Sequence, residues 1–312
     1  INIANYEILH KFDCSSFVGI VLDESSNVQI TNNNILNNVE EDIPRRRVYG
    51  IYIKYSDGNL IANNNIEGSY AGIYMEESSD NEITNITLSN NNINIYLKDV
   101  NDDNNCNNVI EDVFGDNNNQ ILYYNEEVNL ENLNVDELIL CDADNSEVND
   151  IIAKNLFILR TDNSDFSNIQ VDNSEIGIYV ENSNNNIIIS SQITNNKEYG
   201  IHLETSSNNE IIENYIEVYF DENLNRNKGY GIELETSNNN LITDNLIESN
   251  LHGLVIRESS GNEIRDNEIR DNENDLMVSP YENEHCDNII EDNSGTDNKP
   301  ILYYNEQVNL EN

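Results

Sequence analysis

The sequence GIHLETSSNNEIIENYI, from Gly200 to Ile216, carries the pattern that decides the fold. Counted from its glycine, apolar residues stand at positions +1, +3, +11 and +16, and asparagines stand at +9 and +14. The same pattern starts again, in stronger or weaker form, at six other glycines: Gly19, Gly50, Gly72, Gly177, Gly231 and Gly253. Repeats of this length are typical of solenoid proteins, in which each unit stacks on the next.

The spacing of these glycines predicts the architecture. Gly50 to Gly72 is 22 residues, and Gly177 to Gly200 is 23. Apolar residues two apart show the alternation of a β-strand and not of a helix. Short strands between Asn, Ser and Gly turns cannot bury their apolar faces alone, so they stack about 4.8 Å apart on the next coil. We therefore predict an all-β right-handed parallel β-helix with coils of about 22 residues.

The asparagines at +9 and +14 have a physical role in such coils. Asn tolerates the left-handed backbone of a corner, and stacked Asn side chains hydrogen-bond to one another from coil to coil. A disordered Asn-rich segment is the alternative, but disorder would not keep the Ile and Leu residues in phase.

The composition limits the classes of partner. Acidic residues number 59 against 15 Lys and Arg, for a formal net charge of −44. Nucleic acids and anionic lipids need a basic surface, so we exclude both as partners. The charge suits a body that is soluble in high salt, or one that gathers divalent cations or basic patches of other proteins.

The chain begins INIANYEILH, without an initiating Met or the regions of a signal peptide, and no apolar stretch reaches the length of a membrane span. We expect a processed chain or an excised segment that does not itself insert into a membrane.

Four cysteines are present, without CxxC spacing: Cys14, Cys106, Cys141 and Cys286. Cys106 and Cys286 occupy equivalent places in a longer repeat. We therefore expect them to be small buried hydrophobic residues rather than parts of a disulfide or a metal site.

This longer repeat contains several coils. The sequence CNNVIEDVFGDNNNQILYYNEEVNLEN, which ends at Asn132, returns as CDNIIEDNSGTDNKPILYYNEQVNLEN, which ends at Asn312. The glycines of the two copies are offset by 181 residues, so 1–132 matches 181–312, and 133–180 supply further coils. We expect one continuous β-helix over 1–312. The second copy stops where the first continues, which favours a longer parent array or head-to-tail self-association.

Two rows of residues recur at positions that should face outward. A tyrosine recurs at +2 in three successive coils: Tyr52, Tyr74 and Tyr96. They form either a platform for sugar rings or a partner protein, or a plain stacking ladder. A glutamate recurs at +4 in three later coils: Glu181, Glu204 and Glu235. Carboxylates at this spacing either bind Ca²⁺ or remain a solvated acidic face.

The run Arg45-Arg46-Arg47 departs most sharply from the overall charge. It holds 3 of the 15 basic residues and lies on a projecting loop, Val39 to Arg47. It either docks onto an acidic face of a neighbouring molecule or pairs with the acidic residues of its own loop. The sequence contains no nucleophile elbow, phosphate loop or zinc motif.

The pattern of GI-strand, Asn turn and NxI resembles the right-handed parallel β-helix repeat proteins, in particular the NosD-like, carbohydrate-and-sugar-hydrolase type repeats of archaeal cell-surface proteins. The resemblance covers nearly the whole chain and implies the fold. That family spans lyases, hydrolases, epimerases, copper-maturation factors and surface-layer proteins, so it does not imply one reaction. The DPHE motif of alginate epimerase-like members is absent. Leu251-His252-Gly253 and Arg257 near Glu235 only partly echo the motifs of polygalacturonase-like and pectate-lyase-like members.

We predict a non-enzymatic, extracellular structural module of a surface layer, filament or adhesin, which assembles through its ends and projecting loops. The tandem long repeats and the lack of a catalytic constellation favour this function. The alternative is a β-helix that binds or cleaves polysaccharide through the tyrosine row and the acidic row. Copper handling would need Met and His clusters, which the sequence lacks.

Overall fold

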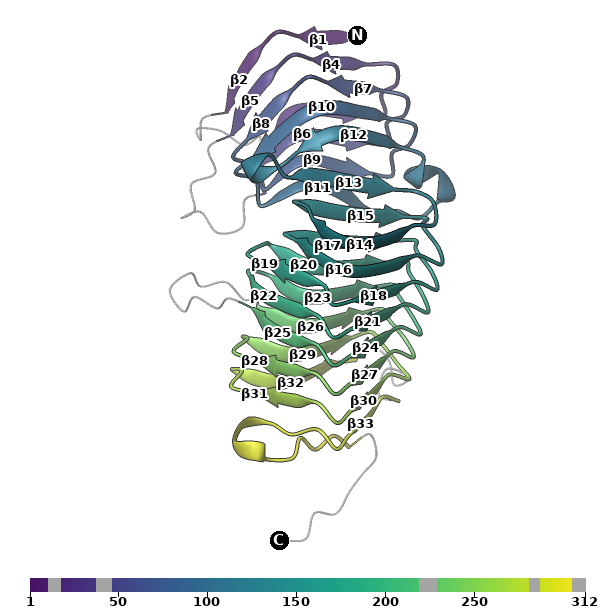
Figure 1. Ribbon diagram of the computed structural model, residues 1–312, viewed down its shortest axis with the longest axis vertical. Helices are drawn as coiled ribbons and strands as arrows, with labels where there is room; N and C mark the ends of the chain where they lie inside the picture. The colour runs from purple at the N-terminus through teal and green to yellow at the C-terminus, as the bar shows by residue number, and fades with distance from the viewer. Residues whose placement is uncertain (11–17, 38–46, 219–228, 281–286, 305–312) are drawn as a thin grey trace.

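The computed structural model describes residues 1–10, 18–37, 47–218, 229–280 and 287–304. This part of the chain is a rod of stacked parallel strands (Figure 1), which confirms the predicted all-β parallel β-helix. Three short 3-10 turns interrupt it: η1 (Asp103–Cys106), η2 (Asp116–Asn118) and η5 (Thr296–Asn298). None of the described helical turns is long and apolar enough to cross a membrane.

The described strands form three sheets. The largest follows the path β1 (Asn2–Ala4), β4 (Gln29–Thr31), β7 (Leu60–Ala62), β10 (Glu82–Ser89), β12 (Val109–Phe114), β13 (Gln120–Tyr124), β15 (Glu137–Cys141), β17 (Asn155–Leu159), β20 (Ile176–Glu181), β23 (Tyr199–Glu204), β26 (Tyr230–Glu235), β29 (His252–Arg257) and β32 (Asn274–Ser279). Attached to it through β10 are β8 (Asn65–Glu67), β5 (Asn34–Asn37) and β2 (Glu7–His10).

The other two sheets complete the coils. The smaller holds β3 (Val18–Asp23), β6 (Tyr49–Lys54), β9 (Ala71–Glu76) and β11 (Ile93–Lys98). The larger runs through β31 (Glu268–Arg270), β28 (Leu246–Glu248), β25 (Tyr215–Val218), β22 (Gln192–Asn196), β19 (Gln170–Asp172), β16 (Glu147–Ala153), β18 (Asp165–Ser167), β21 (Ile187–Ile189), β24 (Glu210–Ile212), β27 (Leu241–Thr243), β30 (Glu263–Arg265) and β33 (Ile289–Glu291), with β14 (Asn129–Asn134) beside β16.

The register of the strands reproduces the repeat of the sequence. Ile201 lies opposite Ile178 on one side and Ile232 on the other, and Ile232 lies opposite Leu254. All four side chains are fully buried. Burying such a side chain stabilises the fold by about 1.5–3 kcal/mol, so the in-phase apolar residues hold the coils together.

The glycine that opens each coil is required by close packing. A Cβ atom on Gly231 would lie 2.5 Å from the carbonyl oxygen of Gly253 and 2.6 Å from Cγ2 of Ile247. Both contacts are shorter than any side chain tolerates, and one of them is to the main chain of the next coil. The backbone therefore approaches its neighbour more closely here than any other residue permits.

Buried asparagines form ladders along the rod, as predicted. Asn209 donates to Oδ1 of Asn240 at 3.2 Å, and Asn240 donates to Oδ1 of Asn262 at 3.1 Å. Each Oδ1 also accepts a main-chain N–H of the preceding coil. The left-handed corners, however, fall one residue earlier than predicted, with φ of 58° at Asn208 and 55° at Glu213. The ladder asparagines therefore satisfy buried backbone groups, and the residues before them make the turns.

The glycine strands lie in different sheets in the two copies. In the first copy they form the four-stranded sheet, and in the second they belong to the largest sheet. The glycine strands pass from the four-stranded sheet to the largest sheet around β12 and β13, which pair antiparallel. We call this change the exchange of sheets. The core is consequently divided into two clusters, with β15, β17 and β20 as the wall between them. Phe157 and Tyr179 pack into the first cluster, and Leu156 and Ile178 pack into the second.

Glu137 covers the edge of β11 at this wall. Its buried carboxylate accepts hydrogen bonds from the main-chain N–H groups of Asn94 and Ile95, at 2.5 and 2.9 Å. Burial raises the pKa of Glu137 to about 8, and the two N–H groups oppose that shift. Each donor left unpaired here would cost about 1–3 kcal/mol. The carboxylate thus completes a strand edge that the exchange of sheets leaves open.

The prediction that Cys106 is an unpaired buried residue is wrong. Cys106, at the end of η1, forms a disulfide with Cys141 at the end of β15, and their Cα atoms are 5.3 Å apart. Comparing Cys106 with Cys286 concealed this pair, because Cys141 belongs to the coils between the copies. The exchange of sheets brings the two elements together. Cys14 and Cys286 lie outside the described residues.

Candidate functional site

The glutamate row is stacked as the spacing predicts, but it is divided between two clusters. Glu181 lies opposite Glu204, and Glu204 lies opposite Glu235, on β20, β23 and β26. The carboxylates of Glu181 and Glu204 converge with that of Asp99, whereas Glu235 converges with His202 and Glu233. The three glutamates therefore do not form one ligand set.

The cluster of Asp99, Glu181 and Glu204 already contains a positive charge of the protein. Lys98, from the first copy, forms an ion pair with Glu204 and donates to the hydroxyl of Tyr179 at 2.6 Å. Tyr179 in turn donates to Glu204 at 2.6 Å. Burial raises the pKa of Glu181 to about 7, although Lys98 opposes the shift. The ammonium group supplies the cation here, so this cluster favours a junction between the copies over a Ca²⁺ site.

The second cluster combines an imidazole with two carboxylates. His202 Nε2 lies 3.6 Å from Oε2 of Glu233 and 3.4 Å from Oε2 of Glu235. Arg257, on β29, holds the other oxygen of Glu233 at 2.7 Å and donates to the hydroxyl of Tyr230 at 3.1 Å. The neighbouring imidazole of His202 lowers the pKa of Glu235. Nitrogen and oxygen donors of this kind suit a divalent metal ion.

His202 stands at +2 of its coil, a position that the repeat places outward and where tyrosine recurs in other coils. The sequence alone therefore did not indicate that His202 is a ligand. The structure places it opposite Glu233 in the strand register. The available signal was that His202 and Glu233 occupy the +2 position of two neighbouring coils. That signal becomes informative only once burial is known, because both side chains are buried and not on an open face.

The tyrosine row is a stacked ladder that is partly exposed at Tyr52 and Tyr74 and buried at Tyr96. The rings of Tyr52 and Tyr74 are 5.1 Å apart and those of Tyr74 and Tyr96 are 5.4 Å apart, both edge to face. Tyr96 is 5% exposed and also packs near Phe157 and Tyr179 across the wall. Tyr52 donates to a carboxylate oxygen of Glu76. Tyr96 therefore packs the first copy against the coils of residues 133–180, and it is closed to a glycan.

The arginine run is only partly described. Arg45 and Arg46 lie outside the described residues. Arg47 pairs with Glu198 at 3.1 Å, and its guanidinium lies over the ring of Tyr70 at 4.6 Å. Glu198 belongs to the coils after the exchange, so Arg47 makes a third contact between the two parts of the chain.

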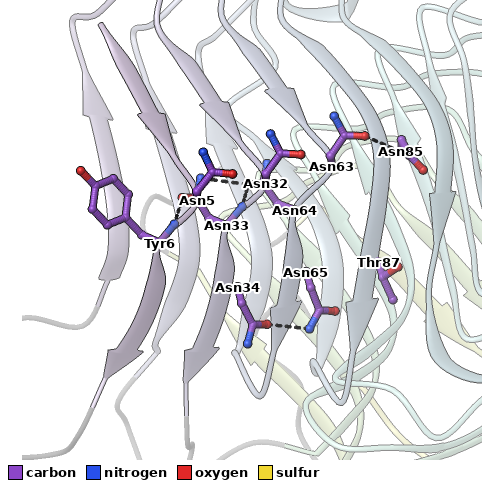
Figure 2. Close-up of a pocket in the computed structure, with 10 residues that line it drawn as sticks. All are labelled: Asn5, Tyr6, Asn32, Asn33, Asn34, Asn63, Asn64, Asn65, Asn85 and Thr87. Carbon is purple, nitrogen blue, oxygen red and sulfur yellow. Dashed lines mark hydrogen bonds between the residues drawn. The ribbon is translucent and has the colours of Figure 1, made fainter.

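A different surface, the Asn groove, is hollowed on the first copy (Figure 2). It is an open groove of about 800 Å³ lined by ten residues: Asn5, Tyr6, Asn32, Asn33, Asn34, Asn63, Asn64, Asn65, Asn85 and Thr87. The groove crosses successive strands, so the same positions recur from coil to coil. None of the lining side chains is charged at neutral pH.

The exposed amides of the groove come from left-handed corners. The corner row consists of Asn5, Asn32, Asn63 and Asn85, with φ between 52° and 63°. Asn65 donates to Asn34 at 2.8 Å, and Asn85 donates to Asn63, so the amides are oriented by one another. Buried Asn33 accepts the main-chain N–H of Tyr6, whose ring is 60% exposed at the end of the row.

The second copy provides an internal comparison for this row. Residues 181 positions after Asn32, Asn63 and Asn85 are Glu213, Asp244 and Asp266. These acids are also at left-handed corners, with φ of 55°, 58° and 55°. The corner geometry therefore accepts a carboxylate, and the neutral amides of the first copy are a local departure from an acidic protein. The row is not apparent from the glycine repeat, because that repeat marks only the ladder asparagines, one residue later.

Two family models match the sequence. The model described as "right handed beta helix region" matches residues 18–137. The model described as "periplasmic copper-binding protein (NosD)" matches residues 143–222 and 217–311, and so covers 143–311, which is 169 of the 312 residues. Comparison with curated protein sequences finds no match.

Several solved structures are similar to the chain. The periplasmic alginate epimerase AlgG is 12% identical, with 88% of this chain and 72% of that chain covered and a TM-score of 0.42. Tailspike protein 3 of bacteriophage CBA120 is 10% identical, with 95% and 52% covered and a TM-score of 0.43. DFA-IIIase from Arthrobacter chlorophenolicus is 10% identical, with 86% and 63% covered and a TM-score of 0.38. These values are too low to carry over an activity.

Proposed function

The chain belongs to the NosD family of right-handed β-helix proteins, and we propose that it is an exported, adhesin-like member that binds neutral polysaccharide along the Asn groove. The observation that carries this proposal is the row of exposed amides at Asn32, Asn63 and Asn85. In a chain with a net charge of −44, the same three corners of the second copy bear carboxylates.

The chemistry of the groove suits sugar hydroxyl groups. A side-chain amide offers two donors and an acceptor, so it can bond to a hydroxyl in either direction. The amides recur with the coil spacing of about 4.8 Å, which lets an extended chain bond to successive coils. The exposed ring of Tyr6 offers an apolar face at one end. An anionic polysaccharide would be repelled by the surrounding acidic surface.

The groove supports binding and not cleavage. Glycoside hydrolysis needs two carboxyl groups on either side of the bond, and lyase or epimerase chemistry needs a positioned general base. Tyr6 is the one titratable side chain among the ten that line the groove. An open groove that crosses several coils also suits a polymer better than a small ligand.

An exported location agrees with the disulfide. Disulfides such as Cys106–Cys141 persist in oxidising compartments and are rare in reducing ones. A copper(I) site would gather thiolate, thioether and imidazole ligands. Among the described residues, Cys106 and Cys141 are consumed by the disulfide, Met75 packs in the hydrophobic core, and the second methionine, Met277, is exposed on β32. The described residues therefore do not fit copper(I) handling.

The proposal is tested by binding to immobilised polysaccharides, neutral and anionic, in parallel. We expect binding to a neutral polysaccharide, and a loss of more than about tenfold when Asn32, Asn63 and Asn85 are all changed to Asp. Three lost hydrogen bonds of about 0.5–1.5 kcal/mol each are sufficient for that loss. The folded state should tolerate the change, because the second copy has acids at these corners.

A matched variant controls for added charge. Asn185, Asn208 and Asn239 are exposed corner residues on successive coils, with φ of 57°, 58° and 56°. Changing all three to Asp adds the same charge on another corner of the rod. Binding should remain within about twofold of the unmodified protein. Equal losses in both triple variants, or no binding to any neutral polysaccharide, would overturn the proposal.

A structural role is the second candidate, and the contacts between the first copy and the rest of the rod favour it. The disulfide, the Lys98–Glu204 pair and the Arg47–Glu198 pair tie the parts of the rod together. A rigid rod of this kind could assemble at the cell surface through its ends or the loop from Val39 to Arg47. Electron microscopy with Ca²⁺ and with a chelator tests this. Ordered filaments or sheets would support assembly, and dispersed rods under both conditions would exclude it for this segment.

A further inference from the structure

We propose that His202, Glu233 and Glu235 bind a divalent metal ion of the Zn²⁺ class at the face of β23 and β26. This site is separate from the Asn groove and independent of the polysaccharide proposal. It also differs from the predicted Ca²⁺ row, because only Glu235 belongs to both.

The distances between the donor atoms fit a tetrahedral ion. With metal–ligand bonds of about 2.0–2.1 Å, two ligands of a tetrahedron lie about 3.4 Å apart. His202 Nε2 lies 3.4 Å from Glu235 Oε2 and 3.6 Å from Glu233 Oε2. Direct hydrogen bonds between these atoms would be shorter, at about 2.7–3.2 Å. The separations leave room for an ion between the three side chains.

His202 provides an independent observation. The residue is 6% exposed, and its Nε2 atom makes no hydrogen bond, although it is directed at two carboxylates. A buried polar atom without a hydrogen bond costs about 1–3 kcal/mol, and such an atom calls for an explanation. A metal ion at this point would give the nitrogen a partner.

The surrounding side chains hold the donors in place. The imidazole is stacked on the ring of Tyr199, with centroids 4.5 Å apart and planes 15° apart. Arg257 binds Oε1 of Glu233 and thereby leaves Oε2 directed at His202. Arg257 is a positioning residue, comparable to the outer contacts that orient metal ligands in other proteins. Its positive charge also limits the affinity for a cation, so we expect reversible binding.

The donor set selects the class of ion. Ca²⁺ requires six to eight oxygen ligands, whereas this cluster offers one nitrogen and two carboxylates. Imidazole with carboxylate is a common Zn²⁺ set that leaves the fourth position to water. The half-exposed side chain of Glu235 lies on the solvent side and gives an ion a path of entry.

The test is titration of the full chain with Zn²⁺ in the presence of excess Ca²⁺, which occupies the diffuse acidic surface. We expect one saturable site per chain that Ca²⁺ does not displace. His202→Asn and Glu235→Gln should each weaken it by about 100-fold, and His252→Asn should leave it unchanged. His252 is the matched control, because it stacks on Tyr230 but lies outside the cluster.

Co²⁺ gives a readout that a purely structural role would not produce. Bound in place of Zn²⁺, it should show the visible absorption of a tetrahedral site, and that absorption should disappear in Glu235→Gln. Glu235 is about half exposed, so this variant should fold even if His202→Asn does not. Zn²⁺ binding that Ca²⁺ abolishes, or that Glu235→Gln leaves unchanged, would overturn the proposal.

Discussion

Replacing Glu137 by Gln should change how the stability of the protein depends on pH. The carboxylate is fully buried and accepts two main-chain N–H groups at the edge of β11. Its pKa is raised from 4.5 to about 8 in the folded protein. A raised pKa in the folded state means that the stabilisation is complete below pH about 4.5 and is lost as the pH rises through about 8.

The size of this effect follows from the shift. Each pKa unit corresponds to about 1.36 kcal/mol, so the ionised carboxylate costs up to about 5 kcal/mol at pH 9. Gln is never ionised, but its NH₂ group replaces one of the two oxygens that accept these N–H groups, so one main-chain donor loses its acceptor. At pH 5 the variant should therefore be less stable than the parent protein, by about 1–3 kcal/mol. Between pH 5 and pH 9 the difference in the free energy of unfolding should shift in favour of the variant by up to about 5 kcal/mol.

Urea unfolding at pH 5, 7 and 9, followed by circular dichroism, measures the difference. Glu147→Gln is the control, because Glu147 is an exposed residue of β16 whose carboxylate accepts no main-chain N–H group of the described residues. Glu181, whose pKa is raised to about 7, also lowers the stability of the folded protein as the pH rises. It is present in the parent protein and in both variants, so its contribution cancels when their free energies of unfolding are compared. A stability difference for Glu137→Gln that is the same at pH 5 and pH 9 would refute the reasoning.

Three other changes test the packing. Gly231→Ala should lower the free energy of unfolding by about 1–3 kcal/mol in urea titrations, because its Cβ meets the main chain of the next coil. Cys141→Ser should cost about 2–4 kcal/mol, and the loss should match that caused by reducing the parent protein. Lys98→Met should cost about 3 kcal/mol in thermal and urea unfolding, since it leaves partly exposed Glu204 and buried Glu181 without their cation. The double variant with Glu204→Gln should recover part of that loss, and an additive loss would contradict the ion-pair account.

Most of the fold was predictable because it depends on period. Apolar residues at +1, +3, +11 and +16 can be in phase over many coils only if the strands stack, and Ile201 opposite Ile232 is the direct result. The ladder asparagines were predictable for the same reason. The exchange of sheets around β12 and β13 was not, because it depends on a single antiparallel pairing in a segment that breaks the period. The Cys106–Cys141 bond follows from that exchange and was missed with it.

The candidate sites were less accessible to sequence reasoning. Strand alternation says that Tyr96 and His202 face away from their own coil's core, but not that neighbouring aromatic rings pack against that face. Of the two rows considered as open surfaces, the tyrosine row therefore forms an aromatic ladder, and the glutamate row is divided between two clusters. The Asn groove could not be recognised from its residue type, because asparagine is frequent throughout the chain. Only the comparison of Asn63 with Asp244 at the same corner distinguishes it.

The most direct test of the polysaccharide account is hydroxyl-radical footprinting of the protein, free and bound to the neutral polysaccharide that binds best. Tyr6 and Tyr55 are both exposed, at 60% and 45%, but only Tyr6 lines the Asn groove. The account predicts that the polysaccharide protects Tyr6 from oxidation and leaves Tyr55 unchanged. Oxidation of Tyr6 that does not change on binding, with protection elsewhere on the rod, would contradict it.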